Sequence, residues 1–451
     1  MKPTKGFVRK IPLYFILVGN LVTTALFQNC GKEVFETASP KASTGELWPS
    51  TETLNSVSLL TLGKTYYVSK TGSDSNIGNT INKPFKTIAK GVAALKPGDT
   101  LYLRAGTYTE FINLVRPTNK SGTATAWVTI AGYPGETVII KPTETREAAS
   151  GAIIARGRVS YVVFRNLVID GTNMANKTGW QIRDGNHHFI LDKIEIKNQK
   201  FNGLLIGAKN IVIKNSKIHS AKSVCGCPHE RWYGIYLANG ADVIIENTEI
   251  SNNPGGGMQV YPGPLNNVTI RNNSIHHNNY LLSSPVPGIL VQVYLTGSYI
   301  RDVQIYNNII YGNGMNKPSG PGTGGSGGIK IVNGVENVKV WNNTVYQNRS
   351  YGVLLTGTYP SVPKNTYLQN NIFYANTLGQ IYLANGIGTI STNNLTTDPK
   401  FVNASANNFR LTSSSPAVNK GASLSSIFKT DILGVLRPKG SAYDIGAYES
   451  Y

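Results

Sequence analysis

Three stretches of this chain repeat one pattern: IYNNII (305–310), VWNNTV (340–345) and LQNNIF (368–373). Five related stretches precede them: FRNLVI (164–169), LDKIEI (191–196), IKNSKI (213–218), IENTEI (245–250) and IRNNSI (270–275). Aligned on their third residue, the eight stretches recur 22 to 35 residues apart. A period of that length, with short strands and no helical periodicity, predicts that each repeat is one coil of a parallel β-helix.

A strand that begins with glycine precedes most of the later repeats. Examples are GLLI (203–206), GIYL (234–237), GMQV (257–260), GILV (288–291), GIKI (328–331) and GVLL (352–355). Because side chains alternate along a strand, we expect Ile235 and Leu237 to point into the core and Tyr236 to point outward. The third-position asparagine should lie at a bend, where left-handed backbone costs it little. Stacked asparagines are then expected to hydrogen-bond along the rod.

The composition agrees with a β-rich fold. Asparagine occurs 46 times and glycine 47 times in 451 residues, and both are poor helix formers, which excludes a helical bundle. The formal net charge is +19, and residues 31–451 keep 39 cations against 24 acids, a net of +15. Such a charge suits nucleic acid, anionic lipid or acidic polysaccharide. Since no nucleic-acid-binding motif accompanies it, nucleic acid is not an expected partner.

The N-terminus is typical of an export signal. Four cations precede the mostly apolar stretch 11–27, which is short for a membrane span of about 20 residues. Cys30 follows, and this arrangement resembles a bacterial lipoprotein signal, in which the cysteine is lipidated. A conventionally cleaved signal and an uncleaved anchor are the alternatives. We expect a signal peptide over 1–30, a flexible tether over 31–62, and an outer-membrane or cell-surface lipoprotein.

The two flanks of the repeats are expected to close the rod. Residues 65–110 read as a strand, a turn-rich loop, an amphipathic helix and another strand, and Ile88 and Val92 lie near helical spacing on that helix. Such a helix can cap the apolar core. The pattern therefore predicts a capped β-helix of about ten coils over 63–395 and a closing segment over 396–451.

Both flanks carry a family resemblance. The segments YVSKTGSDSN, PFKTIAKGV and KPGDTLYLRAGTY resemble the start of bacterial right-handed β-helix proteins, including a calcium-dependent pectate lyase family. The segments DPKF, SPAVNKG, LRP and DIGAYE resemble the closing segment of many surface-attached β-helix proteins. The resemblance covers about residues 65–449 and implies an all-β, right-handed parallel β-helix. It also implies calcium, but the sequence shows no evident acidic ligand cluster, so the cofactor stays undetermined.

The outward stripe of the Gly-led strands is the expected binding face. We assign to it Gln181, Arg183, Leu205, Tyr236, Gln259, Tyr261, Gln292, Lys330 and Leu354. The stripe contains no carboxylate, and the chain has no Asp-Asp or Asp-x-Asp pair, which disfavours an inverting glycosidase. A polysaccharide lyase instead needs a base beside a uronate and a cation on its carboxylate. Tyr236, Gln259, Tyr261 and Lys330 are the predicted substrate-binding residues.

The loop SAKSVCGCPHERWYGIYL (220–237) is the most polar one beside this face. As an active site it would supply His229 as base, Glu230 to orient it and Arg231 as carboxylate clamp. As a structural loop it would only join two coils. Cys225 and Cys227 fit a strained disulfide, two free thiols, or with His229 a metal site that lacks a fourth ligand.

These observations favour an envelope-anchored protein that binds an acidic, uronic-acid polysaccharide. Cleavage by lyase-like β-elimination and non-catalytic attachment, as an adhesin or a structural rod, both stay open.

Overall fold

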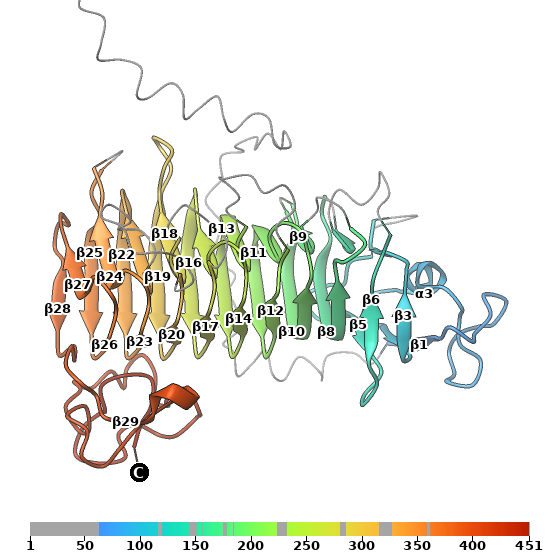
Figure 1. The fold of residues 1–451 in the computed structure, drawn as a ribbon. Coiled ribbons are helices and arrows are strands. Elements are labelled where there is room, and N and C mark those ends of the chain that lie inside the picture. The colour runs from blue at the N-terminus through green and yellow to red at the C-terminus, as the bar shows by residue number, and fades with distance from the viewer. Residues whose placement is uncertain are drawn as a thin grey trace, which may run out of the picture. The chain divides into compact units, whose positions relative to one another are not determined.

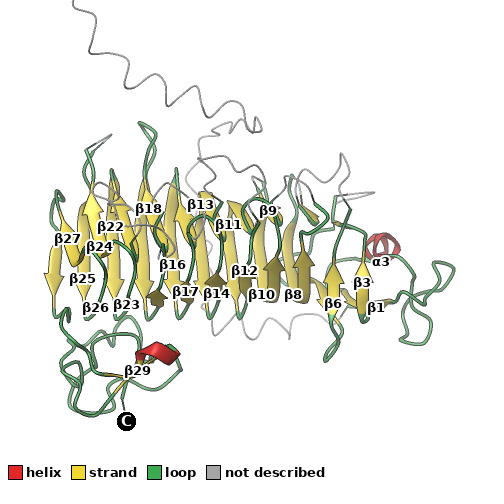
Figure 2. Ribbon diagram, in the orientation of Figure 1, coloured by secondary structure: helices red, strands yellow, loops and turns green. Residues whose placement is uncertain are grey.

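The structure, a computed structural model, describes residues 63–115, 120–143, 151–155, 157–174, 178–183, 185–222, 232–279, 286–314, 327–358 and 361–450. These residues form a parallel β-helix, as the repeats predict (Figures 1 and 2). The strands of successive coils lie above one another in three stacks. These stacks are named A, B and C here, in the order in which the chain passes through a coil. Every pairing within the stacks is parallel.

Stack B is the longest in the described part of the chain. Its strands are β1 (Thr65–Val68), β2 (Thr100–Leu103), β5 (Val128–Gly132), β8 (Ser160–Asp170), β10 (His187–Lys197), β11 (Leu204–Lys214), β13 (Ile235–Glu246), β16 (Leu265–Arg271), β19 (Ile300–Tyr306), β22 (Val335–Trp341), β25 (Lys364–Gln369) and β28 (Ile390–Thr392). The strands β8 and β10 continue into stack C, whereas β11 and β13 begin in stack A.

Stacks A and C are built from shorter strands. Stack A holds β4 (Ile112–Asn113), β7 (Ile153–Ala155), β9 (Trp180–Ile182), the starts of β11 and β13, β15 (Met258–Val260), β18 (Ile289–Gln292), β21 (Ile329–Val332), β24 (Tyr351–Thr356) and β27 (Gly379–Leu383). Stack C holds β3 (Gly106–Tyr108), β6 (Val138–Ile140), the ends of β8 and β10, β12 (Lys217–His219), β14 (Glu249–Ser251), β17 (Ser274–His276), β20 (Ile309–Tyr311), β23 (Thr344–Tyr346) and β26 (Ile372–Tyr374).

The core fills the inside of these coils. Ile235 and Leu237 are fully buried while Tyr236 is half-buried, which confirms the predicted alternation. The same positions recur from coil to coil as buried Val, Ile and Leu. Stacking of coils is therefore what removes each apolar face from water.

The bend between stacks B and C has the predicted backbone. All eight third-position residues adopt positive φ, from 47° at Asn342 to 58° at Asn370, and Lys193 does so at 56°. The hydrogen-bonded ladder, however, is carried mainly by the following residue. Asn308 Nδ2 donates to Asn343 Oδ1 at 2.9 Å, and Asn343 Nδ2 donates to Asn371 Oδ1 at 2.9 Å. One asparagine of each pair thus forms the bend, and its neighbour points inward to bond the next coil.

A second ladder follows stack C. Asn253, Asn278, Asn313 and Asn348 each donate to the next side chain in the series at 2.9–3.0 Å, and Asn348 donates to Asn376. These side chains are fully buried or nearly so. Because a buried amide is costly unless bonded, the two ladders fix the register of neighbouring coils.

The helix α3 (Ile88–Ala94) covers the N-terminal end, as the sequence predicts. Thr87 is its N-cap and accepts a hydrogen bond from the Lys90 amide at 3.2 Å. Ile88 and Val92 are buried in the main core, which α3 joins beside β1, β2 and β4. No helix in the described residues is both long enough and apolar enough to cross a membrane.

The closing segment, residues 396–450, folds back on the outside of the last coils. It contains β29 (Phe401–Asn403), the 3₁₀ helix η3 (Ala404–Ala406) and β30 (Asn408–Leu411). Tyr443 packs in one cluster with Tyr306 and Trp341, which are the last residues of the stack B strands β19 and β22. The Asn342 side chain donates to the Asp444 carbonyl at 2.8 Å. The outward side of the bend thus holds this segment in place.

Candidate functional site

The outward column of stack A is set by the strand register. In successive coils the register aligns Gln181, Leu205, Tyr236, Gln259, Leu290, Lys330, Leu354 and Tyr382. Parallel strands lie about 4.8 Å apart, so these side chains follow one line along the rod. The sequence-based column is correct for Tyr236, Gln259 and Lys330, which are three of the four predicted substrate-binding residues.

Three members of the predicted stripe lie two residues beyond this column, on the same outward side. Arg183, Tyr261 and Gln292 follow Gln181, Gln259 and Leu290 in their coils, and Gln292 pairs with Val332. Leu290 is the column residue that the prediction omitted, because β18 offers two outward residues and only Gln292 was assigned. Arg183 lies one residue beyond the end of β9 and is half-buried.

The outward side chains of this column differ in how far solvent reaches them. Gln181, Leu205, Leu290 and Leu354 are 3–6% exposed despite pointing outward, whereas Tyr236, Gln259 and Lys330 are half-buried. The predicted residue Tyr261, which follows β15, is also half-buried. All four predicted binding residues therefore have surface that a ligand can reach.

Tyrosine rings run beside this column. The Tyr236 and Tyr261 rings stack with centroids 6.4 Å apart, and Tyr294 lies 6.2 Å beyond Tyr261 and is 51% exposed. Burial, with smaller contributions from Tyr261 and Tyr233, raises the pKa of Tyr236 far above its usual value. The Tyr236 hydroxyl consequently stays protonated at neutral pH, where it can donate a hydrogen bond to a ligand.

Several predicted site residues lie outside the described residues. These are the proposed catalytic residues His229, Glu230 and Arg231, the pair Cys225 and Cys227, and Cys30. The loop that carries five of them leads into Trp232 and Tyr233, directly before the strand that holds Tyr236.

The described column does not fit a calcium ion. Calcium takes six to eight oxygen ligands, commonly from several carboxylates. Among the described residues, no group of three or more His, Cys, Asp or Glu side chains is arranged to hold a metal. The described column itself offers only the amide oxygens of Gln181 and Gln259 and the hydroxyl groups of Tyr236 and Tyr382, and no carboxylate.

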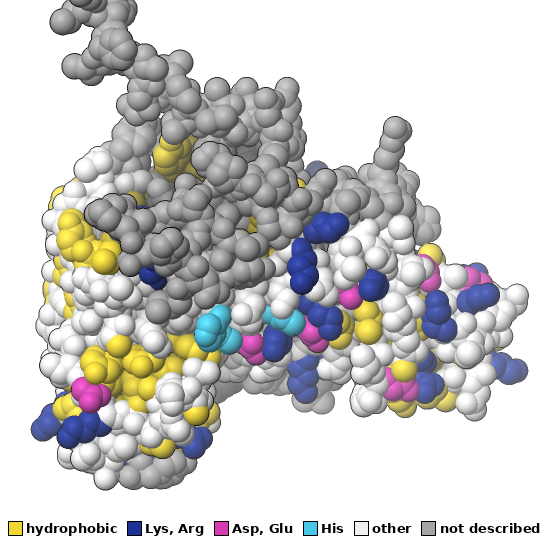
Figure 3. Space-filling model, in the orientation of Figure 1, with side chains coloured by type: hydrophobic (Ala, Val, Ile, Leu, Met, Phe, Trp, Pro, Cys, Tyr) yellow, Lys and Arg dark blue, Asp and Glu magenta, His cyan; other side chains and the backbone are white. Residues whose placement is uncertain are grey.

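Stack C carries a charged ladder that the sequence analysis did not identify. Figure 3 shows histidines and acidic side chains alternating with Lys and Arg along the middle of this face. His219 Nε2 lies 3.1 Å from Glu195 Oε1, and Glu249 contacts both Lys217 at 3.1 Å and His276 at 3.5 Å. The hydrogen bond from His276 is the main cause that lowers the pKa of Glu249 to about 2. Charged residues that alternate along one strand, such as Glu195 and Lys197, could have indicated this ladder from the sequence. Only the register between strands shows which charged side chains contact each other.

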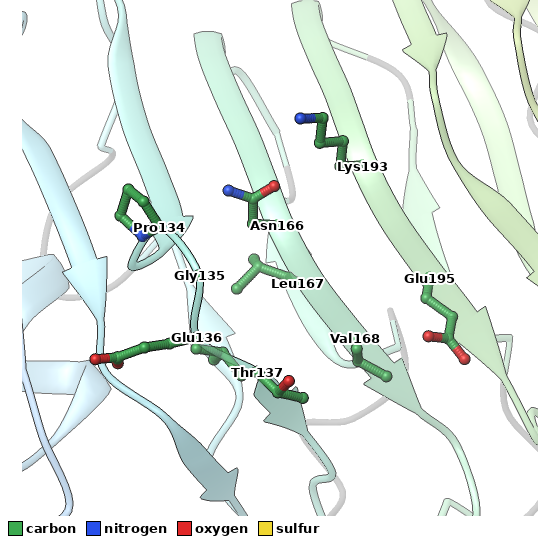
Figure 4. Close-up of a pocket in the computed structure, with 10 residues that line it drawn as sticks. Pro134, Gly135, Glu136, Thr137, Asn166, Leu167, Val168, Lys193 and Glu195 are labelled. Carbon is green, nitrogen blue, oxygen red and sulfur yellow. The ribbon is translucent and has the colours of Figure 1, made fainter.

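A hollow of about 450 Å³ lies at the corner between stacks B and C in the first coils (Figure 4). It is lined by Pro134, Gly135, Glu136, Thr137, Val138, Asn166, Leu167, Val168, Lys193 and Glu195. Its two carboxylates already have partners: Glu136 is bound by Arg104, and Glu195 by Lys197 and His219. No residue of the stack A column lines it, so the two sites are separate.

Comparisons with known proteins support the same architecture. Residues 66–224 match a model described as a Pel9A-like, right-handed β-helix region, and residues 229–419 match a right-handed β-helix region. The chain is 46% identical over 74 residues to pectate lyase PEL9 of Emericella nidulans, which covers 16% of this chain and only 17% of that protein. It is 26% identical to protein YwoF of Bacillus subtilis, over 69% of this chain and 75% of that one.

Solved structures show the same fold. Pectate lyase Pel9A superposes with a TM-score of 0.61 at 19% identity, over 87% of this chain and 98% of that one. A rhamnogalacturonan lyase superposes with a TM-score of 0.53 at 18% identity, over 76% and 91% of the two chains. Identities this low show the fold alone. The chain is thus a right-handed parallel β-helix built of pectate-lyase-like repeats.

Proposed function

We propose that this protein binds an acidic polysaccharide along the outward column of stack A. The observation that carries the proposal is the alignment of Tyr236, Gln259 and Lys330 in one register column, flanked by the tyrosine row of Tyr261 and Tyr294. Tyrosine faces suit sugar rings, amides suit hydroxyl groups, and a lysine suits a uronate carboxylate. The net charge of +15 over residues 31–451 attracts a polyanion over longer distances.

The names of similar proteins point to the same class of ligand. The relatives named above include a pectate lyase and a rhamnogalacturonan lyase, both polysaccharide lyases by name. We extend that class to this chain as a proposal, since the sequence matches are short or distant.

For catalysis we propose β-elimination at the loop before Tyr236. His229 would take the proton from the carbon beside the uronate carboxylate, and Arg231 would neutralise that carboxylate. The carbon–hydrogen bond and the bond to the glycosidic oxygen break, a carbon–carbon double bond forms, and the departing oxygen receives a proton. Glu230 would orient His229.

A non-catalytic surface protein is the second candidate. The raised pKa of Tyr236 favours it, because it disfavours this side chain as the base that β-elimination needs. In either case we propose attachment to the outer membrane through a lipid on Cys30. If a Cys30→Ser form is processed and fractionates with membranes like the parent, the anchor is wrong.

Binding is tested with a panel of uronic-acid polymers and a neutral polymer as reference. We expect Lys330→Ala to weaken binding of the acidic polymers about tenfold, since a charge-assisted hydrogen bond contributes about 1.5–3 kcal/mol, and to do so more strongly at low salt. Tyr236→Ala should weaken binding at all salt concentrations. The matched control is Lys339→Ala, which lies on stack B.

Retention of parental affinity by both variants would reject the site. Cleavage is read separately, from the ultraviolet absorption of unsaturated chain ends. We expect His229→Ala to abolish that signal while binding persists. Absence of the signal in the parent, with binding intact, would select the non-catalytic candidate.

A further inference from the structure

The last coil of the rod differs from every coil before it. Its strands β27 and β28 form the end opposite α3 (Figure 1). β27 pairs with β24 and β28 pairs with β25, and the described residues supply no further strand beyond either. A strand edge without a neighbour presents a row of backbone N–H and C=O groups that can bond another strand.

Large apolar side chains gather on this coil. The exposed ones are Leu378 (48%), Tyr382 (43%), Leu383 (39%), Ile387 (59%) and Ile390 (49%). In the preceding coil, Leu355 pairs with Leu383 and is fully buried. In an earlier coil such positions are covered by the coil that follows. The last coil has no following coil in the described residues, so its equivalent side chains are exposed. A contiguous apolar surface of this kind marks an interaction site.

The same coil carries no charge. From Asn365 to Thr397 the chain has no Lys, Arg, His, Asp, Glu or Pro, although 15% of all its residues are charged. Natural strand edges are commonly protected against association by lysine or proline, and neither protects this one. Residues 31–451 carry a net charge of +15, so two copies repel each other, and contact between them costs least electrostatic energy where no charge lies.

We propose that this end docks against the same end of a second copy of the chain. A two-fold axis perpendicular to the rod reverses the direction of the coil, so facing strands run antiparallel and can exchange hydrogen bonds. A single extended peptide could pair with one strand edge only. A second copy presents the edges of β27 and β28 together at the same spacing. Because α3 covers the other end, the assembly closes at two copies instead of growing into a fibre.

The test is sedimentation of the full chain over a wide concentration range, with solution scattering for its length. We expect a species of twice the mass of one chain and nearly twice its length. Ile390→Lys and, independently, Ile387→Lys place like charges across the two-fold axis and should weaken the dimer at least tenfold. The matched controls Ile77→Lys and Leu433→Lys alter side chains that are 76% and 54% exposed elsewhere, and should leave it intact.

Melting curves verify that each variant is folded before its mass is compared. A parent that stays monomeric at every concentration would overturn the proposal, and so would a dimer of unchanged length. Folded Ile390→Lys and Ile387→Lys variants that dimerise like the parent would also overturn it. None of these outcomes depends on glycan binding.

Discussion

At the scale of single residues, His188 shows how the fold shifts a titration. Its ring stacks on Tyr161 at 4.4 Å, and Asn210 Nδ2 lies 3.1 Å from its Nε2. Burial is the largest cause that lowers the pKa of His188 to about 4, and the neighbouring charges of His187 and Lys209 lower it further. The unfolded chain, with a pKa of 6.5 at this group, therefore binds the proton first as the pH falls.

Stability should consequently decline between pH 6.5 and pH 4. We expect His188→Asn, which tolerates the positive φ at this position, to flatten that decline in melting temperature. Lys193→Asn, at another left-handed bend, should keep the parental slope. Glu249 titrates below its usual 4.5, but burial also lowers the pKa of His277, so the difference in slope between the parent and His188→Asn is what assigns the effect to His188. Identical slopes for parent and His188→Asn would contradict the assignment.

The asparagine ladders give a second prediction at residue scale. Asn308 donates to Asn343 and to the Ile270 carbonyl, and it accepts from Asn273. Asn308→Ala leaves buried polar groups on both neighbouring coils without their hydrogen-bond partner. This loss should lower the free energy of unfolding by about 2–4 kcal/mol. The exposed control Asn266→Ala should change it by less than about 0.5 kcal/mol. Denaturant unfolding measures both, and equal effects would refute the ladder's role.

At the scale of elements, the sequence predicted the coils because their signal is local. Alternation along GIYL and the recurring Asn-Asn pairs both follow from neighbouring residues. What could not be read is which positions meet across coils, since insertions between strands change the spacing from 22 to 35 residues. For this reason the predicted stripe combined two neighbouring outward columns, and Leu290 was missed. The same limit concealed the ion pairs of stack C.

The closing segment explains the LRP and DIGAYE motifs physically. The side chains of Arg437 and Glu449 are fully buried and lie 2.9 Å apart. Arg437 also donates to the Asp444 and Gly446 carbonyls, at 3.0 Å and 2.8 Å. Burial lowers the pKa of Arg437 and raises that of Glu449, so each charge depends on the other for its stability.

Removal of one partner should therefore release the segment. We expect Arg437→Ala to cost about 3–5 kcal/mol in the stability of residues 396–450, because Glu449 stays buried without its cation. Limited proteolysis should then cut the closing segment while the coils resist. The double variant Arg437→Met with Glu449→Gln should recover part of the loss, and the exposed control Arg410→Ala should resemble the parent. Uniform protease resistance across all variants would contradict this account.

At the scale of the whole molecule, the rod presents three distinct surfaces. Stack A offers tyrosines, amides and a lysine in a row, stack C offers paired charges, and the last coil offers an uncharged apolar end. The pairing of stack C charges leaves little net field there for a polyanion. The half-buried tyrosines and Gln259 make stack A the better surface for a long polymer.

The central claim is that an acidic polysaccharide lies along stack A. It is tested most directly by a crystal structure of the full chain with a bound uronic-acid oligosaccharide. The account predicts sugar rings against Tyr236 and Tyr261, with a carboxylate within hydrogen-bonding distance of Lys330 Nζ. An oligosaccharide bound instead at the charged ladder of stack C, or at the hollow beside Lys193, would contradict it.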